Sequence, residues 1–249
     1  MSTHIEAAVA RLLGARKGGA AVPPDFVAAH PLSSSDARTV REKVQAAFGP
    51  VAAWKVAPGS TLENPLYAPV FVKDIHATPV RFPRGTFRKI GMECEIAYRL
   101  GRDLLKPPYT RDQVADAIDS LLPLIEICDS RLVDNKVASA AWRFADHNGN
   151  GAVVLGTPVK DWKSVNLQQL KVTFTFKGKT VAEKSGVPKA NLVDVVHLLA
   201  NQAGTHCGGL RAGHIVTTGS ICGNLPTLPG TEVVASYPGL GDLKVTFDE

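Results

Sequence analysis

Three glutamates lie in apolar segments of this chain, where an ionised carboxylate is costly unless something neutralises it. Glu93 and Glu95 stand two residues apart in an alternating run, and Glu126 lies between two isoleucines. In an extended strand, side chains at positions i and i+2 share a face, so the first two carboxylates would sit about 6.6 Å apart at Cα. Glutamates converging from two strands would make a hard oxygen site suited to Mg²⁺ or Mn²⁺.

The same glutamates also allow an interpretation without a metal. Glu93 and Glu95 could face solvent on an edge strand, which is the usual place for charge. Glu126 could pair with Arg131 or with another of the 28 lysines and arginines. The spacing alone does not separate this alternative from a cation site.

Six short segments follow one another along the chain in a recognisable order. They are Trp-Lys-Val (54–56), Glu-Cys-Glu-Ile-Ala-Tyr-Arg-Leu-Gly-Arg-Asp-Leu (93–104), Leu-Ile-Glu-Ile-Cys-Asp-Ser-Arg (124–131), Ala-Asp-His-Asn-Gly-Asn-Gly (145–151), Leu-Arg-Ala-Gly (210–213) and Thr-Thr-Gly-Ser (217–220). Over roughly residues 50–249, this set resembles the fumarylacetoacetate hydrolase superfamily. The branch that fits best contains 2-keto-4-pentenoate hydratase and 4-oxalocrotonate decarboxylase.

The resemblance implies a divalent metal, Mg²⁺ or Mn²⁺, held by Glu93, Glu95 and Glu126. It implies a lyase of aromatic-compound catabolism that adds water to a 2-hydroxy-2,4-dienoate, with the metal acting as a Lewis acid toward the 2-oxo acid. Two other reactions of the same metal site stay open, a 4-oxalocrotonate-type decarboxylation and a C–C bond hydrolysis. A non-catalytic partner subunit is the alternative from another class.

Two further positions match groups that take part in catalysis in the family. Lys55 matches an active-site lysine, on a short strand that could point it inward. Beside a metal its pKa would fall through burial and cation repulsion, which suits a proton shuttle or a donor to the substrate carboxylate. Asp74 lies near the position where hydratases place an acid that positions water or relays a proton. Their alternatives are an exposed lysine and a solvated turn.

Substrate contacts are expected from two loops. Thr218 could offer a hydroxyl or backbone N–H to the substrate carboxylate, or it could belong to a turn set by Gly219. His147 stands where relatives carry a different segment, and His214 stands where they commonly have an aspartate. His147 could be an acid–base group near the distal end of the substrate, since histidine titrates near neutral pH, or a surface-loop residue.

Composition bounds the partners and the compartment. The chain has 249 residues, a net charge of +5 and only 6% aromatic residues, and it shows no basic run or stacking motif, which argues against nucleic acid. No window approaches the ~18 apolar residues of a membrane span. The four cysteines form no Cys-x-x-Cys pair, which favours a reducing cytoplasm. The resemblance implies a homo-oligomer, and an association with another enzyme of the pathway.

The elements that must position these residues follow an α+β order. Residues 1–49 form an N-terminal helical region, with helices ending at the Gly18-Gly19 and Gly49-Pro50 breaks and a linker at about residues 20–34. Residues 50–249 form the β-rich catalytic domain, expected as a mixed β-sheet roll. Helices are expected from about Thr110 and over Asn191 to Ala203, and a hairpin with one wet face around Lys177-Gly178.

Overall fold

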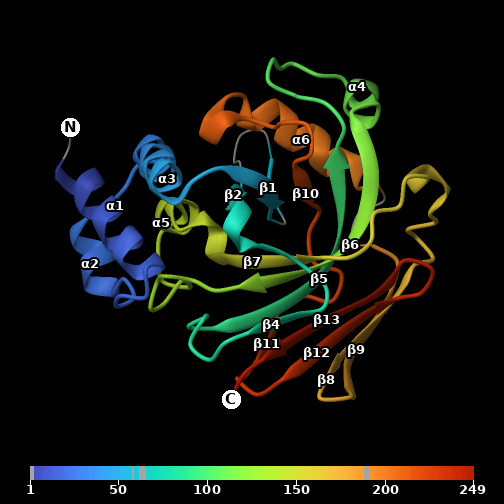
Figure 1. Ribbon diagram of the computed structural model, residues 1–249. Coiled ribbons are helices and arrows are strands. Elements are labelled where there is room, and N and C mark those ends of the chain that lie inside the picture. The colour runs from blue at the N-terminus through green and yellow to red at the C-terminus, as the bar shows by residue number, and fades with distance from the viewer. Residues whose placement is uncertain (1–2, 58, 62–65, 188–190) are drawn as a thin grey trace.

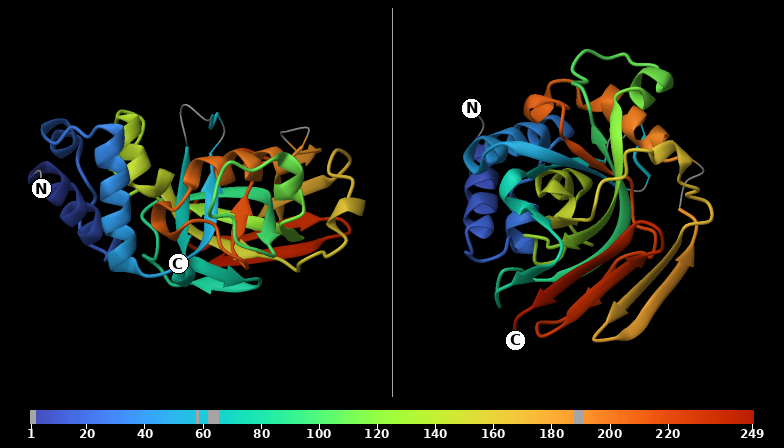
Figure 2. Two further views of the ribbon diagram at one scale, coloured as in Figure 1. Left: turned by 90° about the horizontal axis from the view of Figure 1, so that it is seen from above. Right: turned by 45° about the vertical axis from the view of Figure 1, so that its right-hand side comes forward.

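The computed structural model describes residues 3–57, 59–61, 66–187 and 191–249. Three helices come first and form one end of the molecule (Figures 1 and 2): α1 (Thr3–Arg16), α2 (Pro24–Ala29) and α3 (Ser34–Phe48). A capping box begins α3, because the Ser33 hydroxyl accepts from Asp36 N and Ser33 N donates to the Asp36 carboxylate. The linker expected at residues 20–34 is wrong in part, since α2 lies inside it with Pro24 in its first turn.

The large sheet carries the segments that resemble the family. Its strand order is β2-β1-β10-β5-β6-β7-β3, and β11 pairs with β5. Most neighbours are antiparallel, but β1 pairs with β10 and β3 with β7 in parallel, so the sheet is mixed. The strands are β1 (Val51–Val56), β2 (Tyr67–Phe71), β3 (Ile75–Ala77), β5 (Ile90–Leu100), β6 (Ile118–Cys128), β7 (Asn150–Leu155), β10 (Ile215–Thr217) and β11 (Leu225–Thr227).

A second, five-stranded sheet packs beside the first in the order β4-β13-β12-β8-β9. Its strands are β4 (Val80–Phe82), β8 (Lys171–Phe176), β9 (Lys179–Ser185), β12 (Glu232–Tyr237) and β13 (Gly241–Phe247). The predicted hairpin is confirmed as the antiparallel pair β8 and β9, with Lys177 and Gly178 between them. Val172 and Phe174 of β8 are fully buried while Lys171 is exposed, so one face of β8 is wet.

Three short helices follow within the β-rich part: α4 (Arg111–Ala115), α5 (Ala140–Ala145) and α6 (Val193–Ala203). The helices predicted near Thr110 and before Ala203 are confirmed, and Thr110 caps α4 through its side chain. Single 3-10 turns lie at Val72–Asp74 (η1), His147–Gly149 (η2), Trp162–Ser164 (η3) and His206–Gly208 (η4). No helix among the described residues is long and apolar enough to cross a membrane.

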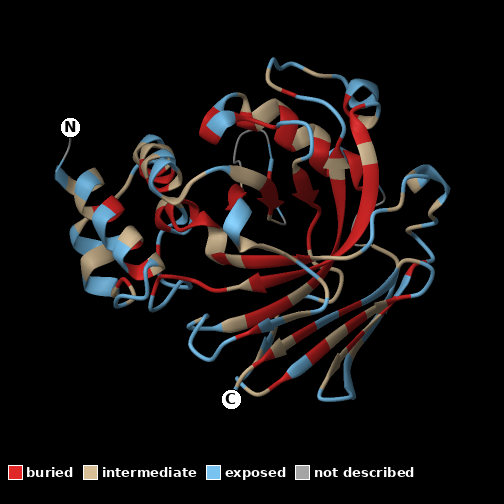
Figure 3. Ribbon diagram, viewed as in Figure 1, coloured by how far each residue is buried: buried red, intermediate tan, exposed pale blue. Residues whose placement is uncertain are grey.

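The core lies between the two sheets and under the helices. In Figure 3 the central strands of the large sheet are almost wholly buried, whereas the second sheet alternates between buried and exposed positions. One apolar cluster runs from α1 through the large sheet to β13, and it includes Leu12, Trp54, Ile96, Phe174 and Val245. The predicted α+β, β-rich class is therefore confirmed, while the division at residue 49 stays a prediction.

Candidate metal and substrate site

The register of β5 and β6 brings the glutamates together. The strands pair antiparallel with Glu93 directly opposite Glu126, and Glu95 opposite Leu124. Side chains directly opposite in such a pair have Cβ atoms roughly 5 Å apart, so the predicted common face exists. Glu95 is 1% exposed and Glu126 0%, and β5 is an interior strand. The solvated edge-strand alternative, which concerned Glu93 and Glu95, is therefore wrong for Glu95, while Glu93 is half-buried.

Lys55 reaches this face from a strand that is not adjacent to β6. In the strand order β10 and β5 separate β1 from β6, a distance of roughly 14 Å in a flat sheet. Yet Lys55 Nζ lies 2.8 Å from Glu126 Oε1, and the lysine is 7% exposed. The sheet must therefore curl around the site, as a roll does. The alternative that Glu126 pairs with a lysine or arginine is therefore confirmed for Lys55, while Arg131 pairs with Asp146.

The lysine keeps its proton in this setting. Burial lowers the pKa of Lys55, but Glu126, Cys128 and Glu93 together raise it well above its usual value. The predicted fall concerned a lysine beside a bound cation and stays a prediction, while the ion pair with Glu126 acts on this pKa in the opposite direction. Lys55 is an ammonium donor at neutral pH rather than a base.

The carboxylates outnumber the lysine that neutralises them. Burial and the charges of Glu126 and Glu93 together raise the pKa of Glu95 to about 8, against the opposing effects of Lys55 and the Gly219 N–H. Burial also raises the pKa of Glu126, against the opposing effect of Lys55. If all three acids ionise, one ammonium leaves two negative charges unbalanced, which is the charge that a divalent cation would neutralise.

An orphaned oxygen shows where further positive charge would fit. Glu126 Oε1 accepts from Lys55 and, at 2.9 Å, from Asn150 Nδ2, but Oε2 is buried with no hydrogen-bond partner among the described residues. A buried carboxylate oxygen without a partner costs about 1–3 kcal/mol or more. The unpartnered oxygen and the neighbouring carboxylate of Glu93 suit a hard divalent ion, and the predicted set of Glu93, Glu95 and Glu126 as its ligands stays a prediction.

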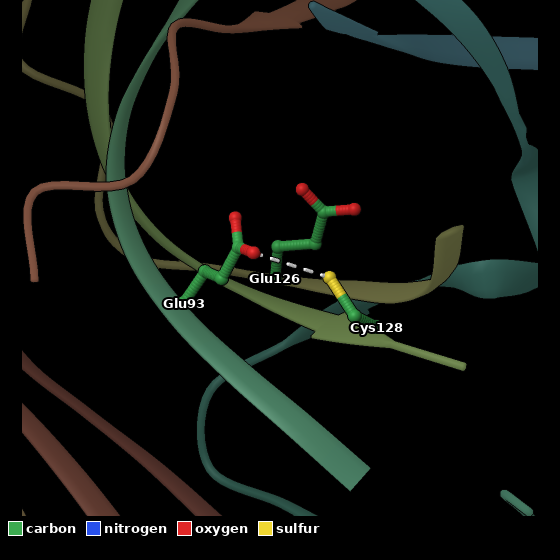
Figure 4. A group of neighbouring side chains, drawn as sticks. All are labelled: Glu93, Glu126 and Cys128. Atoms are coloured by element: carbon green, nitrogen blue, oxygen red, sulfur yellow. Dashed lines mark hydrogen bonds between the residues drawn. The ribbon is translucent and has the colours of Figure 1, made fainter. Parts of the chain in front are cut away.

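A cavity of about 740 Å³ opens beside these groups, and we call it the site cavity. Lys55, Glu93 and Cys128 line its inner part, and Asn224 Nδ2 donates to Glu93 Oε1 at 2.7 Å. Oxygens of Glu93 and Glu126 and the sulfur of Cys128 all lie within 4.8 Å of one another (Figure 4). Glu95 is outside this group, and its Oε2 accepts from Gly219 N at 2.9 Å.

The turn at residues 217–220 is hydrogen-bonded to β5 and to Glu95. Thr218 is buried and its hydroxyl donates to Ile96 O at 2.7 Å, which ties the turn to β5. Gly219, at φ 101°, then presents its N–H to Glu95. The hydroxyl of Thr218 is thus already engaged, and its contact with a substrate stays a prediction.

Asp74 lies apart from the glutamates. Asp74 is the last residue of η1. It lines another cavity, of about 500 Å³, together with Arg16, Arg131 and Lys73. The Nζ of Lys73 lies 3.3 Å from Asp74 Oδ1. The described residues give it no hydrogen bond or ion pair with Lys55 or the glutamates. Its catalytic role stays a prediction that these contacts do not support.

His147 is buried and neutral. It is 1% exposed, its Nδ1 lies 3.2 Å from Pro69 O, and its ring packs on Phe71. Burial, with the charges of Arg16 and Arg41, holds the pKa of His147 well below its usual value. The alternative that His147 is a surface-loop residue is therefore wrong. The expectation that its imidazole titrates near neutral pH is wrong as well. His147 is not among the residues that line the site cavity, and its substrate contact stays a prediction.

His214 supports the first strand. Its Nδ1 accepts from Trp54 Nε1 at 3.1 Å and from Arg211 N at 3.2 Å. Trp54 neighbours Lys55 on β1, so this histidine helps to hold the strand that presents the lysine.

Three residues of the site were not predicted from the sequence: Cys128, Asn150 and Asn224. Cys128 stands two residues after Glu126 and so shares its side of β6, a spacing that could have pointed to it. Asn150 lies in a segment that was noted for its resemblance alone. Asn224 carried no signal, because only the folded loop before β11 brings it to Glu93.

Comparisons with known proteins identify the family of this chain. The model of the fumarylacetoacetate (FAA) hydrolase C-terminal family matches residues 44–248. A 2-hydroxyhexa-2,4-dienoate hydratase from Comamonas testosteroni is 28% identical over 158 residues, which cover 63% of this chain and 60% of that protein. A 4-oxalocrotonate decarboxylase from Pseudomonas putida is 27% identical over 203 residues, which cover 78% of this chain and 74% of that protein.

Solved structures show the same fold. The 4-oxalocrotonate decarboxylase from Pseudomonas putida G7, complexed with magnesium and adipate, superposes with a TM-score of 0.82 at 20% identity, covering 98% of this chain and 97% of that one. The chain spans about three fifths of the length of the hydratase that it matches. The predicted resemblance to the hydratase and decarboxylase branch is confirmed by these matches. The chain belongs to the fumarylacetoacetate hydrolase family.

Proposed function

We propose that this protein is a metal-dependent lyase that adds water to a 2-hydroxy-2,4-dienoate in the breakdown of aromatic compounds. Glu93, Glu95 and Glu126 would hold Mg²⁺ or Mn²⁺. The observation that carries the proposal is the buried, unpartnered Oε2 of Glu126 directly across from Glu93, in a cluster with more acids than cations. Relatives named as hydratases, and the magnesium of the similar decarboxylase structure, support it.

The metal, when bound, supplies a Lewis acid for the 2-oxo acid end of the substrate. The residues of the chain do the rest. Lys55 holds a proton at Nζ beside Glu126, and from there it can donate to the substrate carboxylate. Asn224 fixes one oxygen of Glu93, and Gly219 N fixes one oxygen of Glu95, so both carboxylates are oriented before anything binds.

The charge around the site cavity suits a small anionic substrate. Besides Lys55, the cavity is lined by Arg88, Lys89 and Lys136. Cations at the mouth of a cleft attract anions and raise their rate of association. A dienoate carboxylate would thus be drawn toward the glutamates only together with a cation that offsets their charge.

Decarboxylation of a 4-oxalocrotonate-type acid is the second candidate. Its support is the sequence match to a 4-oxalocrotonate decarboxylase, which is 27% identical over 203 residues. The two reactions differ in product, since one releases carbon dioxide and the other consumes water. Incubation with each acid and measurement of carbon dioxide release would distinguish them.

Calorimetric titration of oxalate, a planar mimic of the 2-oxo acid, tests the site itself. It should bind the wild type only with Mg²⁺ or Mn²⁺, and Glu126→Gln should abolish that binding. Glu93→Gln is a second variant at a half-buried position, for use if the first fails to fold. The absence of oxalate binding by folded wild-type protein with either metal would contradict the lyase proposal and favour a non-catalytic partner subunit.

We further propose a homo-oligomer in the cytoplasm, associated with another enzyme of the same pathway. Four cysteines without a disulfide support a reducing compartment. Light scattering of the purified protein would give the oligomeric state, and a monomer at micromolar concentration would contradict the proposal.

A further inference from the structure

Cys128 is the donor at this site that the family resemblance leaves without a role. Its Sγ lies 3.5 Å from Glu93 Oε1 and 3.6 Å from Lys55 Nζ. Figure 4 shows the thiol, Glu93 and Glu126 converging from β5 and β6, and one donor atom of each lies within 4.8 Å of the other two. A thiol therefore completes a three-donor group with two carboxylates.

The surroundings of this thiol differ from those of a cysteine in a core. Cys94 is 0% exposed and Cys207 is 7% exposed, and both belong to the apolar cluster. Cys128 is half-buried, lines the site cavity and makes its side-chain contacts with charged groups. Its position serves a ligand in the cavity rather than the packing of apolar side chains.

A second observation points to a positive ligand at the same place. Glu126 is 0% exposed, and its Oε2 has no hydrogen-bond partner within the described part of the chain. Lys55 already occupies Oε1. The remaining oxygen needs a donor or a cation, and one carboxylate oxygen of Glu126 lies within 4.8 Å of donor atoms of Glu93 and Cys128.

The spacing fits a metal that accepts both sulfur and oxygen. Around a tetrahedral ion with metal–sulfur bonds of about 2.3 Å and metal–oxygen bonds of about 2.0 Å, the two donors stand about 3.5 Å apart. The sulfur and Glu93 Oε1 have this separation. Magnesium and manganese prefer oxygen donors, whereas zinc also takes thiolate.

We propose that Glu93, Glu126 and Cys128 form a mixed carboxylate–thiol site that takes a thiophilic divalent cation such as Zn²⁺. The inference uses acids of the proposed function but does not depend on the reaction. When the ion binds, the S–H bond of Cys128 breaks, the proton goes to solvent, and a sulfur–metal bond forms, with no change of oxidation state. Zn²⁺ then competes with Mg²⁺ or Mn²⁺ for Glu93 and Glu126.

Cd²⁺ and Co²⁺ are the probes, because a sulfur ligand gives each an ultraviolet charge-transfer absorption that carboxylates do not give. The purified full chain would be titrated with each ion as wild type, as Cys128→Ser and as Cys222→Ser. Cys222 is also half-buried and outside the three-donor group, and its thiol hydrogen-bonds Cys94, so Cys222→Ser controls for sulfur offered by that second pair of thiols. Calorimetry with Zn²⁺ and Mn²⁺ would give the affinities, and circular dichroism would verify that each variant is folded.

We expect the charge-transfer absorption in wild type and Cys222→Ser but not in Cys128→Ser. Cys128→Ser should weaken Zn²⁺ binding about tenfold or more and change Mn²⁺ binding much less. Equal Zn²⁺ affinity in folded Cys128→Ser, or no charge-transfer absorption in wild type, overturns the proposal. Metal-dependent oxalate binding with such a result would leave the proposed function intact, and a sulfur-bound Cd²⁺ without oxalate binding would refute that function alone.

Discussion

Replacing Lys55 by methionine should show how much the ammonium of this lysine contributes to the free energy of unfolding by neutralising the buried glutamates. The substitution keeps most of the apolar stem but removes the charge 2.8 Å from Glu126 Oε1. Glu126 then keeps a hydrogen bond from Asn150 and loses its ion pair, while Glu93 and Glu95 remain nearby. The result is a buried carboxylate with like charges around it and no counter-charge.

The size of the effect follows from the distance. Two unit charges 2.8 Å apart attract by about 6 kcal/mol at an effective dielectric constant of about 20. Protonation of Glu126 would relieve part of the loss, and removal of one partner from a buried ion pair typically costs about 3–5 kcal/mol. We expect the free energy of unfolding of Lys55→Met to fall by that amount.

Urea denaturation with a double-mutant cycle would measure it. Glu126→Gln in the Lys55→Met background removes the orphaned charge and should restore about 2 kcal/mol or more. Lys73→Met is the matched control, because this exposed lysine pairs with Asp74 at 3.3 Å and should change stability by about 0.5 kcal/mol or less. A loss below about 1 kcal/mol in Lys55→Met, or no recovery in the double variant, would refute the reasoning.

Three further substitutions test the surroundings of the site. Asn224→Ala removes the 2.7 Å hydrogen bond to Glu93 and should weaken Mn²⁺ binding about tenfold in calorimetry; an unchanged affinity would show that Glu93 is held without it. Arg131→Met leaves Asp146 buried and should cost about 3–5 kcal/mol in urea denaturation, and a loss below about 1 kcal/mol would contradict this. The pKa of His147 is lowered by folding, so its neutral ring favours the native state above the unfolded pKa of 6.5, and this stability is lost as the pH falls below that value. His147→Asn should therefore reduce the acid dependence of the unfolding free energy by about 1.4 kcal/mol per pH unit between roughly pH 6 and pH 4.5, which equal slopes in urea titrations would disprove.

Local sequence determined the elements and the identity of the acids. The i and i+2 spacing of Glu93 and Glu95 puts them on one face of any strand, because side chains alternate along an extended chain. An apolar run around Glu126 implies burial, and the capping residues Ser33 and Thr110 mark helix starts through hydrogen bonds to backbone N–H groups within a few residues. These features depend on neighbours in the sequence, so the sequence sufficed.

The tertiary structure alone decided which charges meet. Lys55 faces Glu126 only because the sheet curls across two intervening strands, and this ion pair raises the pKa of the lysine. Asn224 and Glu93, 131 residues apart, meet for the same reason. Burial of His147 likewise depends on distant packing. Coulomb energies and desolvation depend on distances and burial in space, and the local pattern of residues does not contain these quantities.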